Sequence, residues 1–150
     1  MRYLFDTSAL LNIIRDLGSD SLALLRDGYV LPLTIYEVGN AMWKEATLLN
    51  RISIEEALLT LRHVKNTVNK FMKTVDLEDA NLALKLAHQL KITYYDASYI
   101  AVACELDAKL VTDDHELRRR IEQKKNRQAH RDLGEKAILI SSREMTPSLL

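Results

Sequence analysis

The N-terminal stretch reads Tyr3-Leu4-Phe5-Asp6-Thr7-Ser8-Ala9-Leu10, and it decides the fold. Its first three residues form a short apolar run that is typical of a buried strand. The run stops at Asp6, where Thr7 and Ser8 offer hydroxyl caps for a helix that begins around Leu10. A buried strand that passes directly into a helix predicts the opening of an α/β domain.

The same alternation of short apolar strands and amphipathic helices recurs along the chain. Further strands are expected at residues 29–31, 74–75, 109–111 and 137–140. Helices are expected from Ser19, Thr34, Ser53, Asp76 or Glu78, Ala97 and Glu116. This order predicts βαβ units, and hence an α/β fold: a three-layer α/β/α sandwich with a central, mainly parallel twisted sheet.

Length and composition indicate one ordinary globular domain. The chain has 150 residues without a linker-like stretch or repeat, so we expect a single domain over residues 1–150, with residues 145–150 as a loose tail. The hydrophobic fraction of 47% excludes a disordered chain. Because the formal net charge is zero, any nucleic acid must be held by a local basic patch.

The number of cysteines and the lack of long apolar runs indicate the cellular compartment in which the protein is expected. Cys104 is the single cysteine, which excludes a disulfide framework or a cysteine metal site within one chain. The N-terminus lacks the apolar core of a secretory signal, and no apolar run reaches membrane-spanning length. We therefore expect a cytoplasmic protein with no membrane partner.

Acidic residues lie at the ends of predicted strands or the starts of predicted helices. They are Asp6, Glu37, Asp96, Asp113 and Asp114. In an open parallel sheet the carboxyl ends of the strands share one edge, so topology is expected to gather these side chains. Taken singly, Asp96, Asp113 and Asp114 are better explained as helix caps, and Glu37 is at least as well explained as a first-turn acid or part of a solvated helix face. Asp6 is the exception, because Thr7 and Ser8 can cap the helix without it. The joint placement is what favours a site.

A cluster of carboxylates has one physical requirement. Crowded carboxylates repel one another and raise each other's pKa unless a cation lies among them. Ligands that are all oxygen favour the hard ions Mg²⁺ or Mn²⁺ over zinc. One or two such ions can polarise water and stabilise the attacking and leaving oxygens of a phosphodiester. The acids therefore predict metal-dependent phosphodiester hydrolysis.

Four short pieces in this order resemble the PIN domain family, especially its toxin-like ribonucleases of VapC type. They are residues 3–10, Glu37 with Asn40, Tyr95-Asp96-Ala97-Ser98-Tyr99-Ile100-Ala101, and Leu110-Val111-Thr112-Asp113-Asp114. The resemblance implies a metal-dependent endoribonuclease that cuts RNA. It implies that Asp6, Glu37, Asp96 and Asp114 are catalytic and hold the metal.

The resemblance also implies supporting roles. Asp114 matches the family acid better than Asp113, because that acid usually lies two residues after the strand-end threonine, here Thr112. Asp113 is then either an alternate metal ligand or a residue that holds the metal ligands in place without contacting the metal. Thr7 and Ser8 would bond a metal water or the phosphate, or simply cap a helix, and Asn40 would orient Glu37 or be an ordinary surface residue. A homodimer is implied too, with a small antitoxin partner if the protein is a toxin.

A basic run follows the acidic pair at residues 113–114. It is longer than this connection usually is in the family and contains Arg118, Arg119, Arg120, Lys124, Lys125, Arg127 and Arg131. Such an arm would track RNA phosphates and steer substrate to an acidic cleft. It is equally well explained as a solvated extension of a helix.

Two other functions compete with cleavage of RNA. A phosphatase with an aspartate nucleophile needs a second aspartate two residues after the first, and the sequence has Ser8 there. A PIN scaffold that binds RNA or protein without cutting stays open, although the intact acids argue against it. RNA binding without cleavage in Mg²⁺ or Mn²⁺ would favour the scaffold.

Overall fold

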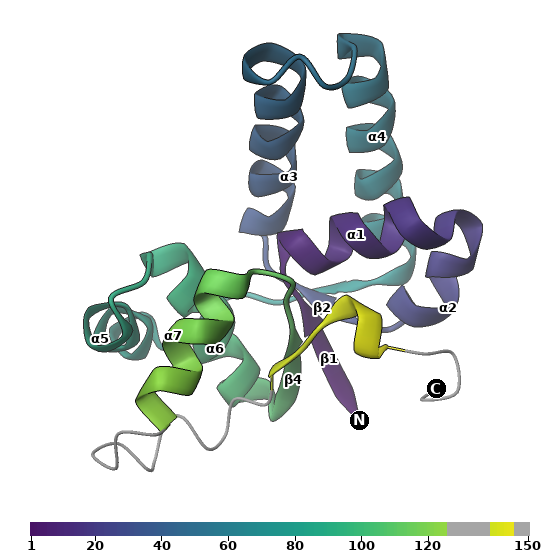
Figure 1. The fold of residues 1–150 in the computed structure, drawn as a ribbon. Helices are drawn as coiled ribbons and strands as arrows, with labels where there is room; N and C mark the ends of the chain where they lie inside the picture. The colour runs from purple at the N-terminus through teal and green to yellow at the C-terminus, as the bar shows by residue number, and fades with distance from the viewer. Residues whose placement is uncertain (126–138, 146–150) are drawn as a thin grey trace.

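The protein is built on a central sheet whose four strand pairings are all parallel (Figure 1). The computed structural model describes residues 1–125 and 139–145; of Lys124 and Lys125 it describes only the backbone. The strand order is β3-β2-β1-β4-β5. The strands are β1 (Arg2–Phe5), β2 (Tyr29–Val30), β3 (Lys73–Thr74), β4 (Ala108–Val111) and β5 (Leu139–Ile140).

Helices connect these strands, as the alternating pattern predicted. The α-helices are α1 (Thr7–Leu17), α2 (Ser21–Leu25), α3 (Leu33–Trp43), α4 (Ile54–Phe71), α5 (Ala80–Leu90), α6 (Tyr94–Leu106) and α7 (His115–Lys125). Shorter turns are η1 (Gly18–Asp20), the π-helical η2 (Lys44–Leu48) and η3 (Ser142–Glu144). The capping box predicted at Ser53 and Glu56 is present at the start of α4.

Three helix caps differ from the sequence prediction. Asp6 itself caps α1, where Thr7 and Ser8 were expected to do so. Helix α3 begins at Leu33 after Pro32, and Thr34 is fully buried with its hydroxyl accepting from the Leu31 amide. Asp79, rather than an earlier acid, caps α5. Each difference arises because local spacing allows several caps and the packing of the helix selects one.

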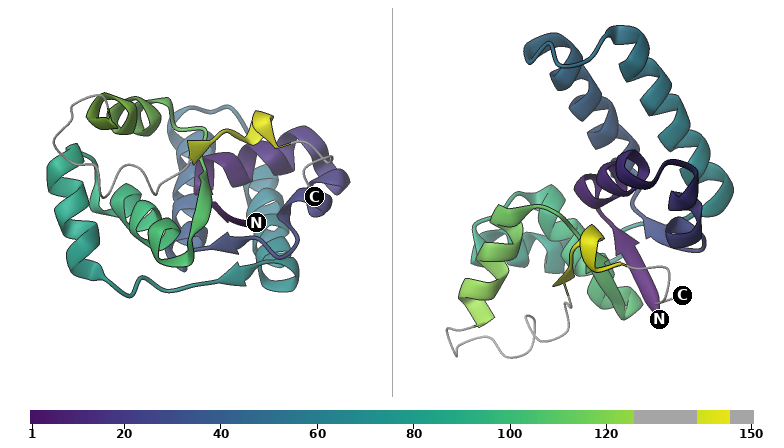
Figure 2. Two further views of the ribbon diagram at one scale, coloured as in Figure 1. Left: turned by 90° about the horizontal axis from the view of Figure 1, so that it is seen from below. Right: turned by 45° about the vertical axis from the view of Figure 1, so that its right-hand side comes forward.

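The two faces of the sheet carry two separate apolar cores. Successive strand residues point to opposite faces, so Phe5 packs with α1, α2, α3 and α4, whereas Leu4 packs with α5, α6 and α7. In β4, Val111 packs in the same core as Phe5, and Leu110 packs in the same core as Leu4. Figure 2 shows α1, α2 and α4 on one side of the strands and α5, α6 and α7 on the other. The predicted α/β/α sandwich is confirmed.

Helices α3 and α4 pack side by side and project beyond the sheet (Figures 1 and 2). Several large apolar side chains stay exposed on and near this pair, including Trp43, Leu48, Ile54, Leu58 and Leu59.

The chain remains packed up to the end of its described part. Met145 is buried and belongs to the core formed with Phe5 and Val111. The expected tail therefore does not begin at Met145, and its remainder, residues 146–150, lies outside the described residues. Within residues 1–125 and 139–145, no helix is both long and apolar enough to cross a membrane.

Candidate active site

The four predicted acids of the quartet line one cleft of about 960 Å³. Asp6 lies between β1 and α1, Glu37 lies on α3, Asp96 lies in the first turn of α6, and Asp114 precedes α7. Thr7, Ser8 and Asn40 line the same cleft. The parallel topology therefore brings together residues up to 108 positions apart. Asp96 lies inside α6, because this helix begins at Tyr94 after the cap Thr93 and not at Ala97 as predicted.

Asp6 is the most buried of these acids, with 7% of its surface exposed. Its Oδ1 accepts from the Ala9 amide at 2.8 Å and from the Ser8 hydroxyl at 2.7 Å. Burial raises the pKa of Asp6 to about 6; the Glu37 charge adds to the rise, while bonds from Ala9, Thr112 and Ser8 oppose it. The carboxylate is thus held at a cost in free energy that a nearby cation would offset.

Glu37 is oriented from both layers of the sandwich. Its Oε2 accepts from the Thr7 hydroxyl and from the Tyr99 hydroxyl, each at 2.7 Å. The Tyr99 oxygen also bonds the buried Thr34 hydroxyl at 2.9 Å. Burial, followed by the Glu37 charge, raises the pKa of Tyr99, which keeps the phenol protonated as a donor.

Tyr99 is a site residue that sequence reasoning missed. Asn40 was expected to orient Glu37, but within the described residues Glu37 accepts its hydrogen bonds from Thr7 and Tyr99 and none from Asn40. The available signal was a tyrosine in a helix of small apolar residues, because a buried phenol oxygen must find a polar partner.

We expect Tyr99→Phe to reduce both stability and the metal-dependent hydrolysis that the sequence predicts for this cleft. The change removes one donor from Glu37 and a partner from Thr34, which should cost about 1–2 kcal/mol of unfolding free energy. Cleavage should fall by about 10–100-fold, with a higher Mn²⁺ concentration for half-maximal rate. Tyr94→Phe on the same helix is the matched control, and an unchanged metal requirement in Tyr99→Phe would contradict the positioning role.

Asp96 and Asp114 are held by helix capping and still face the cleft. Asp96 Oδ2 accepts from the Thr93 hydroxyl at 2.7 Å, and the Asp96 amide donates to that hydroxyl. Asp114 Oδ1 accepts from the amides of Glu116 and Leu117 at 2.8 and 3.0 Å. The amide of Asp114 donates to the hydroxyl of Thr112 at 3.1 Å. Capping and a place in the site are therefore not alternatives here.

The donor set fits a hard cation that keeps part of its water shell. Hydrogen bonds from the described residues occupy only one carboxylate oxygen in Glu37, Asp96 and Asp114, which leaves the second oxygen available. Within that part of the chain, no three acids, histidines or cysteines are grouped closely enough to hold an ion directly. Mg²⁺ commonly binds through one or two carboxylates and several waters, so contact through water matches this spacing.

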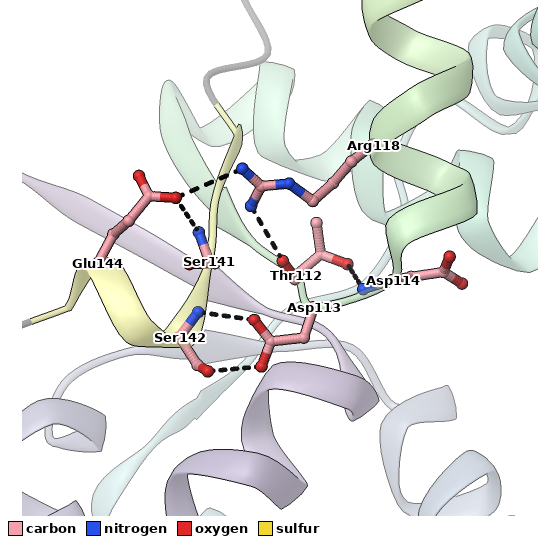
Figure 3. A network of polar contacts seen from close by, with 7 residues as sticks. All are labelled: Thr112, Asp113, Asp114, Arg118, Ser141, Ser142 and Glu144. Atoms are coloured by element: carbon pink, nitrogen blue, oxygen red, sulfur yellow. Dashed lines mark hydrogen bonds and ion pairs between the residues drawn. The ribbon is translucent and has the colours of Figure 1, made fainter.

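Asp113 turns away from the cleft and fastens the C-terminal segment (Figure 3). Its carboxylate accepts from the Ser142 amide at 2.8 Å, from the Ser142 hydroxyl, and from Asn12 Nδ2 at 2.8 Å. Burial alone would raise the pKa of Asp113, but the bonds from Ser142 and Asn12 bring it below its usual value. Between the two neighbouring acids, Asp114 alone lines the cleft.

The three arginines proposed to contact RNA all have acidic partners. Arg118 pairs with Glu144 at 3.4 Å and donates to the Thr112 carbonyl oxygen (Figure 3). Arg119 and Arg120 share the Glu116 carboxylate, each at 2.6 Å, and this pairing lowers the pKa of Glu116 to about 2. The side chains of Lys124 and Lys125, and all of Arg127 and Arg131, lie outside the described residues.

A family model described as PIN domain matches residues 3–123. The chain belongs to the PIN domain family. Exonuclease VapC9 of Pyrobaculum aerophilum is 42% identical to this PIN domain over 88 residues, which cover 59% of the chain and 62% of that relative. Ribonuclease VapC3 of the same organism is 35% identical over 91 residues, which cover 59% of the chain and 67% of the relative. The match thus spans less than two thirds of VapC9.

Two solved structures share the fold of this PIN domain. The crystal structure of PAE2754 from Pyrobaculum aerophilum has a TM-score of 0.67 and 34% identity, covering 80% of this chain and 79% of that one. VapBC2 from Rickettsia felis, solved bound to a DNA fragment from its promoter, has a TM-score of 0.57. Its identity is 14%, over 94% of this chain and 98% of that one, so this likeness concerns the fold alone.

Proposed function

We propose that this PIN domain is a Mg²⁺- or Mn²⁺-dependent endoribonuclease. The observation that carries the proposal is the single cleft lined by Asp6, Glu37, Asp96 and Asp114. The names of two relatives, an exonuclease and a ribonuclease, support nuclease chemistry in general.

The four acids are proposed to hold one or two ions. When bound, such an ion polarises water and neutralises charge on the phosphodiester. The chain itself supplies orientation: Thr7 and Tyr99 fix one oxygen of Glu37, and helix amides fix one oxygen of Asp114. Ser8 holds Asp6, and it also accepts from the Asp113 amide, which joins the start of α1 to the loop after β4.

The biological setting is proposed from the family resemblance. We propose that the protein is the toxin of a toxin–antitoxin pair, acts in the cytoplasm and forms a homodimer. Exposed apolar residues on the projecting α3 and α4 pair, such as Trp43 and Leu59, support a protein interface there. Arg118, Arg119, Arg120, Lys124 and Lys125 stay candidate phosphate contacts; the three arginines would have to exchange a carboxylate for a phosphate.

Cleavage of labelled RNA with and without Mn²⁺ tests the proposal. We expect metal-dependent cleavage by the wild type and a loss of about a hundredfold or more in Asp96→Asn, because one metal-facing carboxylate is removed. Asp107→Asn is the matched control, since Asp107 ends the same helix in a left-handed conformation that asparagine tolerates. RNA binding without cleavage would instead favour the silent scaffold.

A further inference from the structure

Two exposed tyrosines stand at the acidic cleft. Tyr36 is 79% exposed and Tyr95 is 61% exposed, and both line the same cleft as the four acids. Isolated apolar residues on a surface are ordinary. Two large aromatic rings at one candidate active site are less ordinary than isolated apolar residues, because both expose most of their surface to water beside the four acids.

Each ring is adjacent in sequence to a carboxylate of the quartet. Tyr36 precedes Glu37 on α3, and Tyr95 precedes Asp96 on α6. These helices belong to opposite layers of the sandwich (Figure 1). Successive helical side chains diverge by about 100°, so each ring flanks its carboxylate. The two tyrosines therefore border the acids from two separate elements.

Within residues 1–125 and 139–145, neither ring takes part in a cation–π contact or a hydrogen bond. The cation–π contacts in that part of the chain involve Phe71 and Tyr29. No hydrogen bond from a described residue reaches the hydroxyl of Tyr36 or Tyr95. The ring faces are consequently available to another planar group.

The charges around the cleft make such a contact useful for binding RNA. Four carboxylates repel phosphate, and the three arginines near α7 already face Glu116 and Glu144. Lys44 is the cation among the cleft-lining residues. Base–aromatic stacking carries no charge requirement and contributes substantially to the binding of single strands.

We propose that Tyr36 and Tyr95 are recognition residues that stack on unpaired bases next to the scissile phosphate. Bases in a duplex are already stacked on one another, whereas the bases of loops and single strands can be splayed onto aromatic side chains. The choice of RNA rests on the proposed ribonuclease function; the stacking itself rests on the two rings and their place in the cleft.

Binding is measured in an Asp96→Asn background, which prevents cleavage, with Mn²⁺ present. The probes are a short single-stranded RNA, its duplex, and the same strand with abasic central positions. Tyr36→Leu and Tyr95→Leu should each weaken binding of the intact single strand by about tenfold, and Phe variants should retain it. Neither Leu variant should change the affinity for the abasic strand, which already binds weakly.

A matched control comes from α6. Tyr94→Leu removes an exposed aromatic ring that does not line the cleft, and it should leave RNA affinity unchanged. The proposal is overturned if this control weakens binding as much as the cleft variants do, if the abasic strand binds as tightly as the intact strand, or if the single strand does not bind at all.

Two outcomes separate this inference from the proposed function. Base-dependent binding through the tyrosines, with no cleavage by the wild type, would uphold stacking and reject the nuclease. Metal-dependent cleavage with unchanged affinity in both Leu variants would uphold the nuclease and overturn stacking. If Tyr36→Leu abolishes self-association in sedimentation but leaves RNA binding intact, the ring belongs to a protein interface and the proposal is overturned.

Discussion

Asp6→Asn should stabilise the metal-free protein while abolishing cleavage. Burial raises the folded-state pKa of Asp6 to about 6, above the ordinary value of 3.8 expected in the unfolded chain. The folded state therefore binds a proton more tightly, and stability is lost as pH rises through that window. Asparagine cannot ionise, so the variant should gain about 1–3 kcal/mol of unfolding free energy at neutral pH.

The substitution preserves the two hydrogen bonds to Oδ1 at the start of α1, although the hydrogen bond from the Thr112 hydroxyl is not retained. The Oδ1 of asparagine can still accept from the Ala9 amide and the Ser8 hydroxyl and so keep the cap of α1. Denaturant unfolding without divalent ions, followed across pH, measures the difference. It should be largest above about pH 7 and vanish below about pH 3, where Asp6 is protonated in both the folded and the unfolded chain.

Added metal should reverse the order of stability. Mn²⁺ should raise the unfolding free energy of the wild type more than that of Asp6→Asn, because a bound ion is stabilised by the carboxylate. Asp107→Asn serves again as the control and should follow the wild type at every pH and metal concentration. Equal stability of wild type and Asp6→Asn across the whole pH range would show that Asp6 carries no such charge penalty.

Asp113→Asn should have the opposite effect, a loss of stability at neutral pH. The ionised carboxylate accepts from Asn12 and twice from Ser142, and it has no donor of its own. An asparagine amide would place donor against donor at one of these contacts, which should cost about 1–3 kcal/mol of unfolding free energy. Cleavage should fall by about tenfold, because Asp113 anchors the loop that carries Asp114.

The pH dependence distinguishes this loss from a general packing defect. The folded-state pKa of Asp113 is lowered, so its contribution is present above the ordinary carboxyl pKa and is lost as pH falls through the lowered value. The gap between wild type and Asp113→Asn should therefore narrow in acid. Ser142→Ala, which removes only the hydroxyl donor, should show a smaller loss; a gap independent of pH would contradict the ionic role of Asp113.

Local patterns were sufficient to predict the architecture. The apolar run before Asp6, repeated before Asp113, predicted parallel strands that end at one edge, because strand and helix periodicities are local properties of the chain. Once that topology is accepted, the meeting of Asp6, Glu37 and Asp114 in one cleft follows from it. Neither the parallel fold nor the meeting of these acids depends on knowing individual side-chain contacts.

The partners of each acid could not be read from local spacing. Tyr99 is 62 residues from Glu37, and Ser142 is 29 residues from Asp113, so only the packing of distant elements brings them together. The same packing decided that Asp6 rather than Thr7 caps α1.

The sequence by itself determined that acids at strand ends would share one edge of a parallel α/β sheet. The reason is that the alternation of strands and helices, and their order along the chain, follow from local residue patterns. The tertiary structure alone decided which carboxylate oxygens face the cleft, that Asp114 enters it while Asp113 binds η3, and that Tyr36 and Tyr95 border it. Side-chain direction at a loop or helix start depends on contacts made across the whole fold. Two acids that are neighbours in the sequence, such as Asp113 and Asp114, can therefore face different parts of the structure.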